Sequence, residues 1–183
     1  MVLNGVICTY VMEAKRVDSP GKKPVTVTRR PVRSEDEAFL FELYSCIRAE
    51  ELEAFGWSKD QRDIFLKMQF EAQQKFYRGE YPKVDQQVVF WKDQSIGRII
   101  IIRADNEIRL ADIAILPDFR NAGIGITLIQ ELLDEGKEAA QPVRLQVLKT
   151  NRAVRLYERL GFSIIDESST HLLMERRPIG KEI

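Results

Sequence analysis

Apolar residues recur along this chain in two rhythms that predict its elements. Near-continuous apolar runs at 96–102 and 108–116 are typical of strands covered on both faces. From 126 to 133 the apolar positions instead follow helical spacing, with acidic residues on the other side. A short helix is expected at 151–160, ended by Gly161. The pattern predicts alternating strands and helices in one α/β domain with a mixed sheet.

The N-terminal half is expected to supply one strand and two helices. β-branched residues at 25–28 predict the strand, and capping boxes predict helix starts at Ser34 and Ser58. The second helix has an apolar residue at every fourth position: Ile64, Met68, Ala72 and Phe76. The remaining strands are expected at 87–91, 143–147, 162–165 and 171–174.

A basic, irregular stretch precedes this pattern. Residues 15–33 carry seven basic residues against one acid. We interpret the stretch as a solvated arm, with a contact arm for an acidic partner as the alternative. The expected boundaries are an N-terminal extension at 1–24, the domain at 25–176 and a tail at 177–183. The first residues lack the basic lead and cleavage site of a secretory signal, which favours a cytoplasmic protein.

Composition argues against several kinds of chemistry. The 28 Lys and Arg residues balance 28 Asp and Glu residues. The chain therefore lacks the net positive charge that favours nucleic-acid binding. No apolar run approaches the roughly 20 residues that span a bilayer. Two distant cysteines and one histidine do not form a zinc motif, and they weaken any hydrolase interpretation. We therefore expect no metal, no nucleic acid and no membrane as partners.

One segment between a predicted strand and a predicted helix suits an anion. Free N–H groups at a helix start attract negative charge, and Gly123 and Gly125 let a phosphate approach the main chain. Arg120 adds a forked positive donor. Ile126 and Leu128 exclude a Walker A loop and the dinucleotide fingerprint. An ordinary glycine-containing turn is the alternative interpretation of these residues.

Two segments together resemble a known family. Arg120 to Gly125, read as Arg-x-x-Gly-x-Gly after a strand, is similar to the acyl-CoA pyrophosphate loop of the GNAT N-acetyltransferases. Residues 151–162 resemble the family's Asn-x-x-Ala-x-x-Leu-Tyr-x-x-x-Gly-Phe segment. With the element order, the resemblance extends over about 25–176. It implies a single GNAT-like domain, whose mixed, mostly antiparallel sheet is flanked by helices and splayed at the cofactor slot.

The resemblance also implies that acetyl-CoA is the co-substrate. In the family, loop amides hold the pyrophosphate and the pantetheine arm lies along the preceding strand. The residue matching Asn151 helps to bind pantetheine, and the residue matching Tyr157 protonates the departing thiolate, although Tyr157 could instead be a core residue. The implied cofactor-binding residues are Ile113, Ala114, Ile115, Arg120, Asn121, Ala122, Gly123, Ile124, Gly125, Thr127 and Asn151.

The candidate general base is Asp112. An acid inside an apolar strand is costly unless it faces a cleft or a partner. A structural hydrogen-bonding role and exposure on the outer face are the alternatives. The neighbouring position, often Glu in the family, is Ala111 here. His171 is a weaker candidate, with a surface position as its alternative.

The expected reaction is transfer of an acetyl group to a primary amine, on a small molecule or an amino acid, by direct attack. A non-catalytic acyl-CoA-binding module is the alternative, and a homodimer is a further expectation. Acidic residues within 34–63 would attract a cationic amine, and aromatic residues would line its pocket. A solvated helix face and ordinary core packing are the alternative interpretation of these residues. The aromatic residues are Phe55, Trp57, Phe70, Tyr77 and Tyr81.

Overall fold

The computed structural model describes residues 26–53, 55–81 and 84–178. Within these ranges, seven strands form one sheet in the order β1-β2-β3-β4-β5-β7-β6. The predicted extension at 1–24 lies outside the described residues. The strands are β1 (Thr28–Pro31), β2 (Asp85–Trp91), β3 (Gln94–Arg103), β4 (Ile108–Ile115), β5 (Val143–Leu148), β6 (Ser163–Glu167) and β7 (His171–Arg176).

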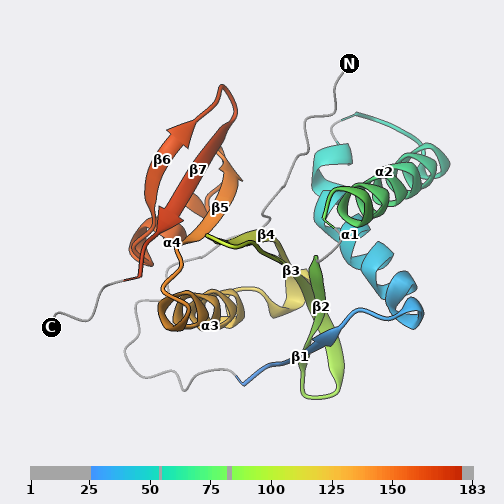
Figure 1. Cartoon of the computed structure of the whole chain (residues 1–183). Coiled ribbons are helices and arrows are strands. Elements are labelled where there is room, and N and C mark those ends of the chain that lie inside the picture. The colour runs from blue at the N-terminus through green and yellow to red at the C-terminus, as the bar shows by residue number, and fades with distance from the viewer. Residues whose placement is uncertain (1–25, 54, 82–83, 179–183) are drawn as a thin grey trace, which may run out of the picture.

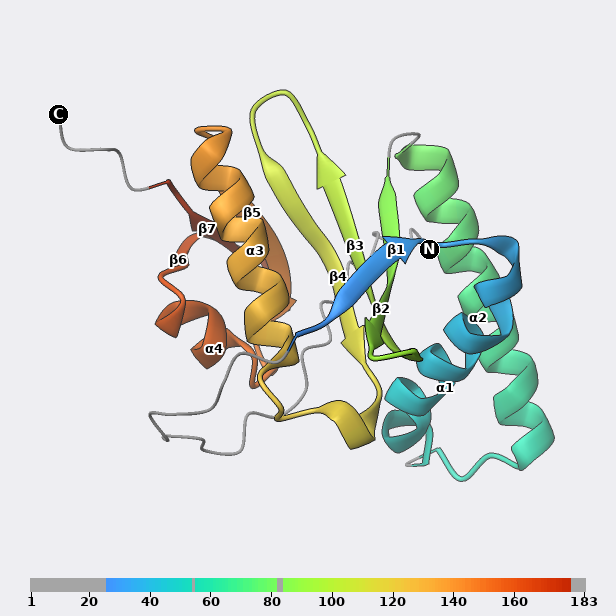
Figure 2. The same cartoon turned by 90° about the horizontal axis from the view of Figure 1, so that it is seen from below.

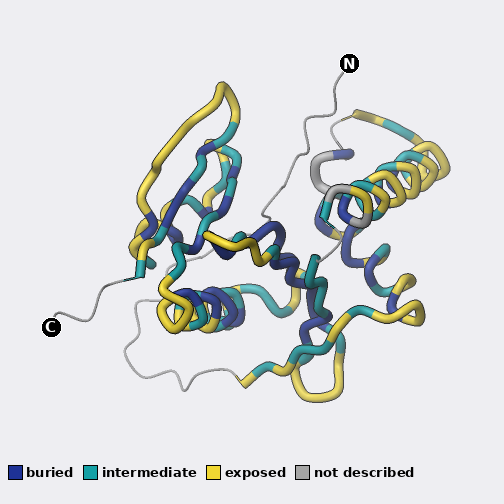
Figure 3. Tube along the Cα trace, in the orientation of Figure 1, coloured by how far each residue is buried: buried dark blue, intermediate teal, exposed yellow. Residues whose placement is uncertain are grey.

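Four α-helices cover this sheet in the described part of the chain. They are α1 (Glu37–Glu53), α2 (Lys59–Glu80), α3 (Ile124–Glu138) and α4 (Val154–Arg159). Helices α1 and α2 lie on one side of β2–β4, and α3 lies on the other (Figures 1 and 2). The main core is packed between α3, α4 and the sheet, and smaller clusters join α1 and α2 to it. Figure 3 shows the buried positions running along the central strands.

Every strand pairing is antiparallel except that of β4 with β5. That parallel pairing covers three rungs and ends where Leu110 faces Leu145. Strand β4 continues to Ile115 along β3, while β5 continues to Leu148 along β7. The two strands therefore separate, which confirms the predicted mixed sheet with its splay.

The two predicted helix caps have different outcomes. At Ser58 the capping box is present, because Ser58 Oγ accepts from the Gln61 N–H at 3.3 Å and Gln61 Oε1 accepts from the Ser58 N–H at 2.9 Å. The box predicted at Ser34 is wrong. A short 3₁₀ turn at Ser34–Asp36 comes first, and the Asp36 carboxylate accepts from the Arg33 N–H at 2.7 Å.

One further sequence expectation is corrected. The first strand begins at Thr28, three residues later than predicted. The apolar residues at every fourth position of α2 are largely exposed, with Ile64 at 72% and Met68 at 55% of their full exposure. Leu66, Phe70 and Tyr77 are buried instead. Helix α2 is therefore rotated so that another stripe packs against α1 and the sheet.

Candidate active site

The gap between β4 and β5 is lined by main chain. The N–H of Leu116 donates to Ile96 O on the β3 side at 2.9 Å. Successive residues of a strand direct their N–H groups to opposite edges, so the N–H groups of Ile113 and Ile115 point toward β5. Beyond Leu110, β5 no longer pairs with them. The slot thus offers one edge of β4 to an extended ligand.

The glycine-containing loop lies at the open end of this slot. Gly123 has φ of +86° and caps α3, and Asn121 is also left-handed, with φ of +62°. Thr127 is the first residue of α3 whose N–H reaches an acceptor of the same helix, Gly123 O at 3.0 Å. The preceding amides therefore lie at the positive end of the helix dipole, outside the intrahelical ladder. This arrangement can hold a phosphate or diphosphate.

Polar side chains hold the loop and the start of α4. Arg120 Nε donates to Ile115 O at 2.9 Å, which ties the loop to the end of β4. Thr127 Oγ1 donates to Gly123 O at 3.3 Å. Asn151 Oδ1 accepts from the Ala153 N–H at 2.9 Å and closes the turn that leads into α4. These residues shape the slot through backbone contacts.

Tyr157 of α4 is fully buried and packs edge-on against Phe162, with ring centroids 5.8 Å apart. Among the described residues, its hydroxyl has no hydrogen-bond partner. Burial raises the pKa of the phenol far above its ordinary value, and the nearby Asp112 carboxylate raises this pKa further. The hydroxyl is therefore a neutral donor at all ordinary pH values, and it is free to donate to a ligand atom.

Asp112 points to the α1 and α2 side of β4, where it is only 3% exposed. Its Oδ2 accepts from both Nε and Nη2 of Arg98, the first at 3.1 Å. Gln73 Oε1 of α2 lies 3.4 Å from Arg98 Nη2. Burial raises the pKa of Asp112 above its ordinary value, although the Arg98 guanidinium opposes this rise. A carboxylate of raised pKa is a better proton acceptor than an exposed one.

A cavity of about 20 Å³ lies above this ion pair, between α1, α2 and the sheet. Its polar lining consists of Tyr44, Arg48, Gln73, Arg98 and Asp112. Of these residues, sequence reasoning identified only Asp112. Arg98 carried the same signal, because it interrupts the apolar run 96–102 as Asp112 interrupts 108–116.

Other residues expected near the acceptor lie elsewhere. Phe70 and Tyr77 are core residues, Phe55 is exposed, and none of the five predicted aromatic residues lines this cavity. His171 Nδ1 lies 2.8 Å from Thr170 Oγ1, at the start of β7. Asp36 pairs with Arg30 rather than facing a ligand. The side chains of Glu50, Glu51 and Glu53, part of the expected acidic rim, lie outside the described residues.

Neither a metal site nor a membrane helix is found in the described ranges. There, no group of three or more His, Cys, Asp or Glu side chains could hold a metal ion. No helix in these ranges has the length and apolar character needed to cross a bilayer.

Comparison with known families assigns the domain. Residues 84–164 match the model of the GNAT acetyltransferase domain. This matched region, less than half of the chain, is similar to the GNAT acetyltransferases. The match contains the β4–β5 slot, the glycine loop and Tyr157, and it leaves α1 and α2 outside.

Relatives of this chain include a curated enzyme of Haemophilus influenzae, the [ribosomal protein bS18]-alanine N-acetyltransferase. It is 37% identical over 75 residues, which are 40% of this chain and 51% of the relative. This chain therefore matches about half the length of that relative.

Solved structures share the fold of this chain. The PaiA N-acetyltransferase of Thermoplasma acidophilum, in complex with coenzyme A, is 20% identical, with a TM-score of 0.63 over 83% of this chain and 99% of its own. The ribosomal-protein-S18-alanine N-acetyltransferase of Escherichia coli is 19% identical, with a TM-score of 0.59 over 86% and 99%. At these identities the likeness shows the fold alone.

Proposed function

We propose that this protein transfers an acetyl group from acetyl-CoA to a primary amine of a small molecule or an amino acid. The observation that carries this proposal is the early end of β4–β5 pairing at Leu110, beside a loop of free helix N-terminal amides. The family match and the identity to a curated N-acetyltransferase support acetyl transfer to an amine.

The coenzyme is proposed to bind in two parts. Its diphosphate lies on the amides of residues 121–125, where the dipole of α3 and the guanidinium of Arg120 favour negative charge. Its pantetheine arm lies along Ile113–Ile115 and pairs with the β4 edge as an added strand would. Pairing of this kind uses main-chain groups that β5 leaves unpaired.

The reaction is then a direct displacement at the thioester. The neutral amine nitrogen forms a bond to the carbonyl carbon of the thioester. The resulting oxyanion accepts a hydrogen bond from the N–H of Ile115, which points into the slot. The carbon–sulfur bond breaks, and the thiolate takes the proton of the Tyr157 hydroxyl. The acetylated nitrogen then loses its extra proton, which returns Tyr157 to its hydroxyl form. Asp112 takes the proton that the ammonium form of the acceptor must lose. The products are the N-acetyl amine and CoA.

The test combines CoA calorimetry with an acetyl-transfer assay over a panel of primary amines. Wild-type protein should bind CoA and acetylate at least one amine. Tyr157→Phe should bind CoA like the wild type and lower kcat about 100-fold, the size of a general-acid contribution. Tyr81→Phe is the matched control, because Tyr81 ends α2 and does not line the cavity.

Two outcomes would contradict the proposal in different ways. Failure to bind CoA at millimolar concentration would remove the coenzyme slot itself. CoA binding with no amine acetylated, and with Tyr157→Phe unchanged in every measurement, would leave the non-catalytic acyl-CoA-binding module.

A further inference from the structure

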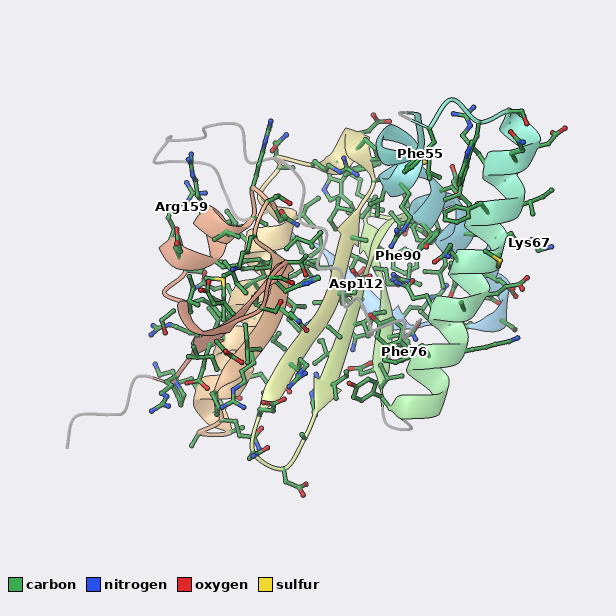
Figure 4. The ribbon with its side chains drawn as sticks, turned by 90° about the horizontal axis from the view of Figure 1, so that it is seen from above. Phe55, Lys67, Phe76, Phe90, Asp112 and Arg159 are labelled. Carbon is green, nitrogen blue, oxygen red and sulfur yellow. The ribbon has the colours of Figure 1, made fainter. Side chains whose placement is uncertain are left out.

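Arg98, which lines the cavity over its pair with Asp112, has an unused buried donor. The Arg98 side chain is only 5% exposed, and its Nε and Nη2 are bound to Asp112. Its Nη1 has no hydrogen-bond partner among the described residues. A buried polar atom without a partner costs free energy, so such an atom beside a cavity indicates a ligand group that satisfies it. In Figure 4 the labelled Asp112 lies on β4 in the middle of the molecule, across from α2.

The charge of the lining favours an anion. Two guanidinium groups, of Arg98 and Arg48, line the cavity against one carboxylate, that of Asp112. Arg48 lies over the ring of Tyr44, 4.6 Å from its centroid, and it interacts with Asp112 at longer range. Since Asp112 neutralises only one of the two cations, the described lining keeps one positive charge. A cationic amine alone would not balance this charge.

We propose that this cavity is an acceptor subsite that binds the carboxylate of an amino-acid substrate. The carboxylate accepts from Arg98 Nη1 and pairs with Arg48, while the amino group lies toward Asp112 and the thioester. This subsite rests on the proposed function and narrows it to amines that carry a carboxylate next to the nitrogen. The two guanidinium groups fit the two oxygens of a carboxylate.

The size of the cavity agrees with such a head group. One water needs about 10–15 Å³, so a volume of about 20 Å³ admits one water-sized group, such as a carboxylate oxygen, and not an aromatic ring or a long alkyl chain. The subsite therefore binds the carboxylate of the acceptor and does not bind its side chain. A peptide N-terminus has an amide in place of the carboxylate and would leave the positive charge unbalanced.

The experiment compares acceptors that differ only in the carboxylate. L-Alanine is paired with ethylamine and L-alaninamide, and L-phenylalanine with 2-phenylethylamine, at saturating acetyl-CoA. A tripeptide that begins with alanine is included as an acceptor to test a peptide N-terminus. Because a hydrogen bond to a charged group is among the stronger ones, the wild type should prefer the amino acids about 10-fold to 100-fold in kcat/KM. Most of this preference should lie in KM, since the anchor binds ground and transition states alike.

Arg48→Gln is the decisive variant, because Arg48 is half-buried and its loss leaves the Arg98–Asp112 pair intact. It should raise KM for L-alanine about 10-fold and change KM for ethylamine far less, because ethylamine has no carboxylate for Arg48 to bind. Arg159→Gln is the matched control, since Arg159 is an exposed arginine of α4 on the far side from Asp112 (Figure 4). A separate binding measurement, with the product N-acetyl-L-alanine in the presence of CoA, tests the subsite without requiring turnover.

The outcomes separate this subsite from the proposed function. Equal kcat/KM for amino acids, decarboxylated amines and the tripeptide would overturn the subsite and leave acetyl transfer standing. A uniform fall in kcat for every acceptor in Arg48→Gln would make Arg48 structural and also overturn the subsite. If CoA binds but no acceptor is acetylated, the proposed function fails. The subsite is then supported only if N-acetyl-L-alanine binds with CoA and Arg48→Gln abolishes that binding, and otherwise it falls too.

Discussion

The two sides of strand β4 present different chemistry to their proposed ligands. Toward β5, the strand offers main-chain N–H groups, and the loop after it offers the amides of a helix start. Toward α1 and α2, the strand offers side chains, among which Asp112, paired with the buried Arg98 of β3, is central. The coenzyme side therefore depends on backbone geometry, whereas the acceptor side depends on the identity of a few residues.

This difference determines which of the two sites a family match covers. The matched region, 84–164, holds every element of the coenzyme side. The acceptor side takes Tyr44 and Arg48 from α1 and Gln73 from α2, and both helices lie outside that region. A shared backbone site is compatible with many sequences, but a side-chain pocket changes its ligand with a single substitution. The acceptor is accordingly the part of the function that this chain must specify by itself.

The largest effect is expected on the acceptor side, from Arg98→Met. This change leaves the buried Asp112 carboxylate without its cation, which costs about 3–5 kcal/mol of unfolding free energy. Urea unfolding at pH 7 measures the loss. The double variant Arg98→Met and Asp112→Leu removes both charges and should recover most of the stability. A single variant as stable as the wild type would contradict the ion pair.

On the coenzyme side the strongest change is Gly123→Glu. Gly123 has φ of +86°, which a side chain adopts only with strain, and the new carboxylate would lie among amides that attract a diphosphate. CoA affinity should fall about 100-fold, equal to about 2.7 kcal/mol. Calorimetry measures this, with Gly123→Asn as the control, because Asn tolerates the left-handed region and adds no charge. Unchanged CoA affinity in Gly123→Glu would place the diphosphate elsewhere.

The coenzyme side is also the part for which the sequence carries a signal, and its residue roles stay a prediction. Arg120 to Gly125 and Asn151 to Tyr157 are contiguous segments, so their resemblance to the GNAT motifs can be seen in the sequence. The Arg98–Asp112 pair joins residues 14 positions apart, and it forms because β3 and β4 pair with Arg98 opposite Ala114. Arg48 and Gln73 reach it from helices whose packing faces have weak periodicity. The pocket therefore depends on tertiary packing that no local pattern encodes.

A smaller, pH-dependent effect is expected where α1 is attached to the sheet. Hydrogen bonds from Arg30, at 2.7 and 2.8 Å, lower the pKa of Asp36 below its ordinary value. A carboxyl whose pKa is lower in the folded state stabilises the protein when the pH is above its unfolded pKa of about 3.9. This stabilisation is lost as the pH falls through the folded pKa.

Asp36→Asn should therefore lower the unfolding free energy by about 1–2 kcal/mol at pH 7. The difference from the wild type should shrink as the pH falls below about 4. Chemical unfolding at a series of pH values checks this. Glu35→Gln is the control, because Glu35 is exposed and its ion pair with Arg30 is loose, at 3.9 Å. A difference that does not change with pH would contradict the lowered pKa.

The smallest effect is expected on the outer face of α2, from Met68→Lys. Met68 belongs to the apolar residues that recur at every fourth position of α2, yet it is 55% exposed. The substitution should change the unfolding free energy by no more than about 0.5 kcal/mol. Leu66→Ala, two positions earlier on the buried face, should cost about 2–5 kcal/mol. If the two effects were reversed, α2 would be rotated about its axis, and Gln73 would no longer reach Arg98.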